Sequence, residues 1–241
     1  MATLIVGLDS LAQLRAMGGT RDPDPVAAAV LAELAGAGGI RVTLAPDAGG
    51  VAERDVRILR DVVRTVLGLR IAPDEEGLTL ALAVRPDLVT LVPGAREGLG
   101  RDRGLDVEDR RSEIAPILAS LKDSGILAAV AVDPLPQQLK AAQRAGAGAV
   151  LLHAGRFCWA ATDASRAAEF EALDNAAKVG QRLGLVIHAG GGIGYQSAGM
   201  IAAIPEIVAI DVGHALIARA ALVGMAEAVR ELRLLLRDES R

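Results

Sequence analysis

The chain has 241 residues, a formal net charge of −4 and a single cysteine, Cys158. Aromatic residues make up only 2% of the chain and no basic surface is predicted, so we expect no nucleic-acid partner. One cysteine excludes an internal disulfide and a thiolate zinc site. The N-terminus lacks a basic region and no apolar run approaches the roughly 18 residues of a membrane span, so we expect no membrane association and a cytoplasmic location.

Short apolar runs alternate with helical patterns along the whole chain. The runs predict strands at residues 3–8, 40–44, 69–72, 88–92, 126–132, 149–152, 185–187 and 207–212. Helical spacing predicts helices at residues 26–37, 53–63, 73–84, 105–123, 137–145, 165–183, 197–204 and 215–237, with a short helix or an ordered loop at 11–19. Buried parallel strands are apolar throughout, and eight such units match the length of one barrel. We therefore predict a single domain over residues 1–241, an α/β fold of the (β/α)₈ (TIM) barrel type with extra helices.

Two glycine turns close the last two units. Gly191 and Gly192 follow the seventh predicted strand, and Gly213 and His214 follow the eighth and open a helix. Glycine lets backbone N–H groups approach a phosphate, and a helix N-terminus favours negative charge. The phosphate site of a TIM barrel is commonly built from these two loops. We therefore predict that these four residues bind the phosphate of a small phosphorylated ligand.

The loop after the fourth predicted strand is longer than usual for a barrel. Residues 93–104 combine four glycines with charged side chains, among them Arg96, Arg101 and Arg103. A long loop on this face favours a lid whose arginines hold a second anionic group. A solvated charge run without a function remains the alternative.

Ionisable side chains also lie at the ends of predicted strands, where TIM-barrel active sites form. Asp9, Asp133, His153 and His188 are therefore candidate catalytic residues. A hydrogen-bonded structural role is the alternative for each histidine. No local ligand spacing supports a metal site, although two histidines and two aspartates on one rim could in principle hold zinc or manganese. Cys158 near Arg156 could be an activated nucleophile, but a lone cysteine is usually a small buried apolar residue.

The chain resembles the pyridoxine 5'-phosphate synthase family over nearly its whole length. The shared motifs are Arg21-Asp22-Pro23-Asp24-Pro25, Arg54-Asp55-Val56-Arg57-Ile58-Leu59-Arg60, Leu91-Val92-Pro93, Gly104-Leu105-Asp106-Val107, Ile201-Ala202-Ala203-Ile204-Pro205-Glu206 and Val212-Gly213-His214-Ala215. The resemblance implies a TIM barrel assembled as a homo-octamer of dimers. It also implies condensation of 1-deoxy-D-xylulose 5-phosphate with 3-amino-2-oxopropyl phosphate, without a metal or an organic cofactor.

Residue by residue, the resemblance retains the phosphate side of the family site and loses the proton-transfer side. Gly192, Gly213, His214 and Asp9 match family residues. The family's asparagine, histidines, arginines and glutamates are replaced by Gly7, Ser10, Gly18, Thr43, Ala45, Gly50, Arg70, Leu151 and Gly191. Since the loss of one general base costs about 10² to 10⁴ in rate, we expect inefficient condensation at best. Two alternatives stay open: an enzyme for another small phosphorylated substrate, with His188 and Asp9 as acid and base, or a working synthase with substitute residues.

Overall fold

The computed structural model describes residues 2–45, 51–94 and 103–237, and its parallel strands close into one barrel in sequence order. Each strand pairs with the next, and β1 pairs with β8 through Ile5 and Asp211. The strands are β1 (Thr3–Gly7), β2 (Gly39–Thr43), β3 (Val66–Ile71), β4 (Leu88–Leu91), β5 (Leu127–Val132), β6 (Ala149–His153), β7 (Val186–Gly190) and β8 (Ile207–Val212). The predicted (β/α)₈ barrel is thereby confirmed.

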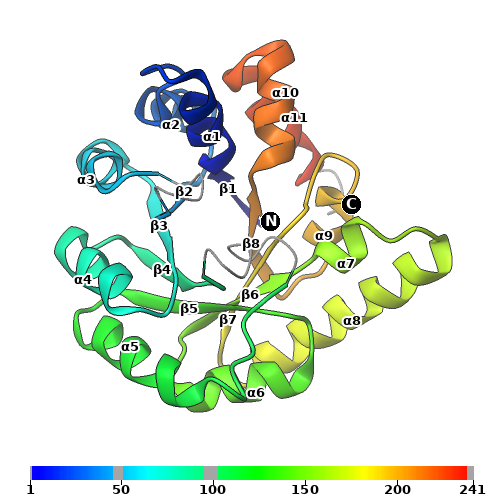
Figure 1. Ribbon diagram of the computed structural model, residues 1–241. Helices are drawn as coiled ribbons and strands as arrows, with labels where there is room; N and C mark the ends of the chain where they lie inside the picture. Colours follow the sequence, from blue (N-terminus) through cyan, green and yellow to red (C-terminus); the bar gives the residue numbers. More distant parts are fainter. Residues whose placement is uncertain (1, 46–50, 95–102, 238–241) are drawn as a thin grey trace.

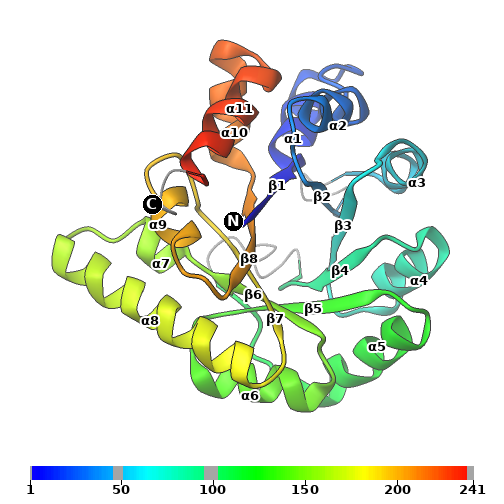
Figure 2. The same ribbon diagram turned by 180° about the vertical axis from the view of Figure 1, so that it is seen from behind.

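Helices surround the barrel, as Figures 1 and 2 show from opposite sides. The helices are α1 (Asp9–Gly18), α2 (Pro25–Leu34), α3 (Glu53–Val62), α4 (Glu75–Val84), α5 (Arg111–Asp123), α6 (Pro136–Ala145), α7 (Gly155–Cys158), α8 (Asp163–Arg182), α9 (Ala198–Ala202), α10 (His214–Val223) and α11 (Met225–Leu235). Within the described ranges, no helix is long and apolar enough to cross a membrane.

Alternate residues of each strand point to opposite sides of the barrel wall. Val150 and Leu152 of β6 belong to the large core between strands and helices, whereas Leu151 packs with Val92 and Ala131 in a separate small cluster. The residues on the same side of the wall as Leu151 therefore face the barrel interior. On β2, β3 and β8 these interior positions include charged residues: Arg41, Arg70 and Asp211.

Several predicted boundaries are wrong, among them the start of β3, which lies at Val66 and not at residue 69. The last helix is interrupted at Gly224, whose φ of 85° lies in the left-handed region, so α10 and α11 are separate helices. The helix expected from residue 105 begins only at Arg111, because Leu105 N–H donates to the Ala131 carbonyl and holds this segment against β5. Strand β7 extends to Gly190 and so includes His188, which the sequence had suggested to lie after the strand.

Candidate functional site

The two predicted phosphate turns lie at the ends of β7 and β8. Gly191 and Gly192 have φ values of 86° and 73°, which side chains rarely adopt, so glycine is required in this turn. Gly213 is the N-cap of the ten-residue helix α10, and exposed His214 is its first residue. Ser10 Oγ lies 3.4 Å from His214 Nδ1 and links the end of β1 to this helix start. The arrangement offers backbone N–H groups and a helix N-terminus to an anion.

His153, a candidate catalytic residue, supports the turn after β7. It is buried at the end of β6, and its Nδ1 accepts a hydrogen bond from Gly155 N–H at 3.3 Å. A β-carbon at Gly191 would lie 2.6 Å from His153 Nε2, and one at Gly192 would lie 2.8 Å from the Trp159 ring. Imidazole and indole rings therefore pack directly under the two glycines, which favours a positioning role for His153.

A small cavity of about 190 Å³ adjoins the same turn. It is lined by Phe157, Cys158, Arg166, Gly192, Gly194, Tyr195, Gln196 and Ser197. Burial raises the pKa of the Cys158 thiol despite a hydrogen bond with Ser197, so this thiol is a weak nucleophile at neutral pH. Arg156 forms an ion pair with Glu169 at 2.7 Å. The activated-cysteine alternative therefore lacks the low thiol pKa that it requires.

A network of buried charges occupies the barrel interior beside these turns. Arg41 of β2 donates from Nε and Nη2 to the two carboxylate oxygens of Asp211 on β8, at 2.9 and 3.0 Å. Arg41 Nη1 also donates to Asp9. Arg70 of β3 donates from Nη2 to Asp211 at 2.6 Å. Asp9 further accepts from the Thr43 N–H at 2.7 Å and the Thr43 hydroxyl at 2.9 Å.

Glycines provide the space for Arg41. A β-carbon at Gly7 would overlap the Arg41 guanidinium, and one at Gly213 would lie 3.2 Å from Arg41 Nη2. One at Gly68 would lie 3.5 Å from the Arg41 side chain. Gly7 stands where the resemblance places a family asparagine. Any side chain at position 7 would overlap the Arg41 guanidinium as it lies here, so glycine at this position makes room for Arg41. Gly213 consequently leaves space for the network and also belongs to the predicted phosphate turn.

Mutual pairing determines the charge states in this network. Burial alone would raise the pKa of Asp211, but the positive charges of Arg41 and Arg70 hold it below its ordinary value. Burial would lower the pKa of Arg41, but Asp211 and Asp9 raise it. Burial and the charge of Arg41 lower the pKa of Arg70, although Asp211 opposes them. Asp211 is therefore an ionised ion-pair partner and a poor proton donor.

His188 lies on β7 close to this network. The register pairs it with Leu151 on β6 and Ala209 on β8, two residues before Asp211. Burial lowers the pKa of His188, while the charge of Asp211 partly opposes that shift. The imidazole is therefore neutral at pH 7 and able to accept a proton.

The lowered pKa of His188 predicts loss of stability in mild acid. The unfolded chain binds a proton near the ordinary pKa of 6.5, whereas folded His188 does so only at lower pH. The contribution of neutral His188 to stability is therefore fully present above the pKa of the unfolded chain, and it is lost as the pH falls toward the lower pKa of the folded protein. We expect the free energy of unfolding, measured by urea denaturation, to decrease less between about pH 7.5 and pH 5.5 for His188→Gln than for the unmodified chain. Equal decreases in the two proteins would contradict this assignment.

Asp133 and the predicted lid meet at the end of β5. Asp133 Oδ1 accepts a hydrogen bond from Gly104 N–H at 2.9 Å, and a β-carbon at Gly104 would overlap the Val132 backbone. Asp133 therefore anchors the end of the long loop. Arg103 is exposed, whereas Arg96 and Arg101 lie outside the described residues. The lid function stays a prediction.

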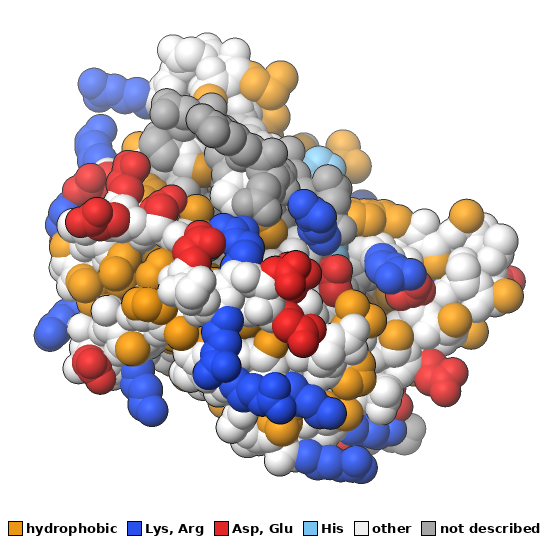
Figure 3. Space-filling model, turned by 60° about the horizontal axis from the view of Figure 1, so that its bottom comes forward, with side chains coloured by type: hydrophobic (Ala, Val, Ile, Leu, Met, Phe, Trp, Pro, Cys, Tyr) orange, Lys and Arg blue, Asp and Glu red, His pale blue; other side chains and the backbone are white. Residues whose placement is uncertain are grey.

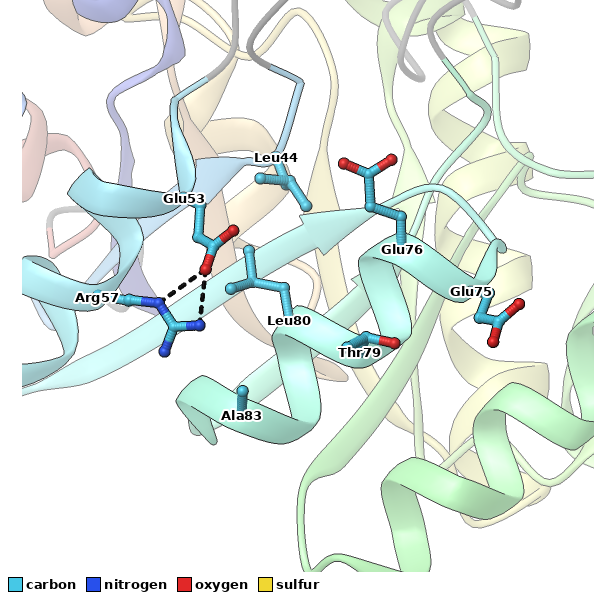
Figure 4. Close-up of a pocket in the computed structure, with 8 residues that line it drawn as sticks. All are labelled: Leu44, Glu53, Arg57, Glu75, Glu76, Thr79, Leu80 and Ala83. Atoms are coloured by element: carbon cyan, nitrogen blue, oxygen red, sulfur yellow. Dashed lines mark hydrogen bonds and ion pairs between the residues drawn. The ribbon is translucent and has the colours of Figure 1, made fainter.

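A larger groove of about 640 Å³ lies outside the barrel between α3 and α4 (Figure 4). Its floor includes Leu44 and Leu80, and Glu53 at its edge pairs with Arg57 at 2.6 Å. The groove is far more acidic than a phosphate site should be, because Glu75 and Glu76 also line it. On the face shown in Figure 3, basic and acidic side chains are interspersed. Among the described residues, no group of His, Cys, Asp and Glu could hold a metal ion.

Together, the closed parallel barrel and its two terminal glycine turns define a TIM barrel with a candidate phosphate site. Residues 4–238 match the family model described as pyridoxal phosphate biosynthesis protein PdxJ, and the chain belongs to that family. It is 45% identical to a pyridoxine 5'-phosphate synthase of Synechococcus sp., over 97% of this chain and 98% of the relative.

Solved structures with low sequence identity share the fold. KGPDC from Streptococcus mutans is 13% identical, with a TM-score of 0.68 and full coverage of both chains. A cube-shaped protein cage designed by fusing symmetric oligomeric domains is 14% identical, with a TM-score of 0.68, over 99% of this chain and 73% of that chain. At these identities the likeness concerns the fold alone.

Proposed function

We propose that this protein binds a small phosphorylated ligand at the barrel mouth and does not run the condensation of pyridoxine 5'-phosphate synthases at the family's rate. One observation carries the proposal. The interior positions nearest the phosphate turns hold a salt-bridge network of Arg41, Arg70, Asp9 and Asp211. The resemblance places a catalytic glutamate at position 70, where an arginine stands.

The network is poorly suited to general acid–base catalysis. A catalytic group must exchange a proton with the substrate, which requires a pKa near the working pH and an unblocked lone pair. Asp9 instead accepts hydrogen bonds from Arg41 and from the backbone and hydroxyl of Thr43. Asp211 accepts from two guanidinium groups. Both carboxylates are therefore used in holding the arginines.

His188 supports a second candidate function, an enzyme acting on another small phosphorylated substrate. A neutral imidazole inside the barrel near an anion site has the protonation state of a general base. Turnover of a phosphorylated substrate that follows the titration of His188 and disappears in His188→Gln would favour this function over binding alone.

Phosphate binding is the direct test of the first proposal. We expect calorimetric titration with inorganic phosphate to detect binding, and Gly192→Ala to weaken it by about tenfold or more, because the backbone there requires a positive φ. Gly184→Ala is the matched control, since Gly184 has a φ of 78° and nothing within 4 Å of its would-be β-carbon. Both variants place a β-carbon on a backbone with a positive φ, but only Gly192→Ala lies in the turn, where the β-carbon also meets the Trp159 ring at 2.8 Å. Absence of phosphate binding to the unmodified chain would overturn the proposal.

We also propose that the chain forms a homo-oligomer through the face of α1, α2, α10 and α11. These helices lie side by side in both ribbon views. Their exposed apolar side chains include Met17 at 85%, Leu34 at 80% and Leu222 at 80% exposure. Large apolar side chains this exposed, on helices that neighbour one another, would lose contact with water in an interface between copies of the chain. The expected octamer rests on the family resemblance.

Two charge substitutions test this interface. We expect Leu34→Glu combined with Leu222→Glu to reduce the particle mass measured by light scattering after size-exclusion chromatography, because a buried unpaired carboxylate opposes association. Leu135→Glu, at an exposed apolar residue before α6, is the control and should leave the mass unchanged. A mass unchanged in the double variant would place the interface elsewhere.

A further inference from the structure

Arg70 has an unsatisfied donor in the barrel interior. Its side chain is 10% exposed, and its Nε atom is buried without a hydrogen-bond partner among the described residues. A buried N–H without an acceptor is costly, and a cationic donor more so, which makes this atom an exception in a folded protein. An acceptor brought by a ligand removes that cost.

Asp211 accepts more hydrogen bonds from Arg41 than from Arg70. Arg41 holds both oxygens of Asp211 in a two-point contact and also reaches Asp9. Arg70 contacts only one oxygen of Asp211, and that oxygen also accepts from Arg41 Nε. Arg70 therefore keeps an unused N–H donor, and its positive charge is only partly balanced by Asp211.

Arg70 lies beside the predicted phosphate turn. A β-carbon at Gly190 would lie 3.3 Å from Arg70 Nη2, and Gly190 directly precedes the turn of Gly191 and Gly192. In the strand register Arg70 is flanked by Thr43 on β2 and Thr90 on β4, and both threonines are buried. A ligand whose phosphate lies in the turn can therefore extend toward a guanidinium between two hydroxyl-bearing residues.

We propose that Arg70 binds a carboxylate of the ligand, so that the ligand is a small phosphorylated carboxylic acid. A guanidinium matches a carboxylate in both geometry and charge. This inference rests on the proposed phosphate site and specifies what lies at the other end of the ligand.

Two probe compounds of equal length test the inference on the unmodified protein. 3-Phosphoglycerate and glycerol 3-phosphate carry the same phosphate ester and differ in a terminal carboxylate against a hydroxymethyl group. We expect calorimetry to give an affinity about 10- to 100-fold higher for 3-phosphoglycerate, the range expected for hydrogen bonds to a charged group. Equal affinities would overturn the inference and leave the phosphate site standing. Failure of both compounds to bind would overturn the proposed function as well.

Substitution of Arg70 assigns the preference to this residue. Arg70→Gln should remove the difference in affinity between the two compounds. Arg70→Lys keeps the charge without the two-point geometry and should keep only part of the preference. Arg57→Gln, at an exposed ion pair on α3, is the control for loss of an arginine. A preference that persists unchanged in folded Arg70→Gln would exclude Arg70 as the carboxylate ligand.

Discussion

Replacing Asp211 with asparagine is expected to reduce the free energy of unfolding by about 3–5 kcal/mol, the cost of breaking a buried ion pair from one side. Asp211 is the shared partner of Arg41 and Arg70, and its side chain is only 5% exposed. Asparagine keeps the shape but removes the charge, so two guanidinium groups remain inside the barrel with only Asp9 to balance them. Urea denaturation followed by circular dichroism measures the loss.

An exposed ion pair provides the comparison. Glu227 pairs with Arg230 on α11, and both side chains are more than half exposed. Glu227→Gln should cost about 0–1 kcal/mol, because solvent screens the pair. Adding Arg70→Gln to Asp211→Asn should recover part of the lost stability, since it removes one of the two uncompensated charges. If Asp211→Asn costs no more than the exposed pair, the network contributes little to the fold.

The barrel was predictable because its information is local. The run from Ile207 to Val212 is apolar except for Asp211, and it is followed by Gly213 and a helical pattern, so strand, turn and helix can be read within a few residues. The predicted boundaries are wrong where a contact with a residue distant in the sequence determines where an element begins or ends. Leu105, for example, lies outside α5 because its backbone bonds to Ala131 on β5. Gly224 is a single glycine in a long helical pattern, and only its backbone angle shows the interruption.

The charge network was not predictable from any one segment. Arg41 and Asp211 are 170 residues apart, and Arg70 and Asp211 are 141 apart. Asp9 and the replacement at Arg70 are evident from the sequence and its family resemblance, whereas the roles of Arg41 and Asp211 appear only in the structure. One signal was present: β2, β3 and β8 each carry one charged residue at an interior position, two of them positive and one negative. A buried charge needs a partner, so such residues should be paired across the barrel.

We expect this protein to form pyridoxine 5'-phosphate at least about 10² to 10⁴ times more slowly than a relative with the full set of family residues, the effect of losing one general base. The assay supplies both phosphorylated substrates and follows the product by chromatography. The synthase of Synechococcus sp., 45% identical to this chain, is the positive control under the same conditions. Product formation at the control's rate would overturn the proposed function and leave family membership intact.

Single reversions to the family residue should not restore that activity, because the structure around each site has adapted to the present residue. Histidine at position 191 would need a φ near 86° and would place its β-carbon 2.6 Å from His153 Nε2. Glutamate at position 70 would add a third carboxylate beside Asp9 and Asp211 around the single charge of Arg41. We therefore expect Gly191→His and Arg70→Glu each to lose stability without gaining product. Product formation by either variant at more than about a tenth of the control rate would show that proton transfer was limited by that one residue.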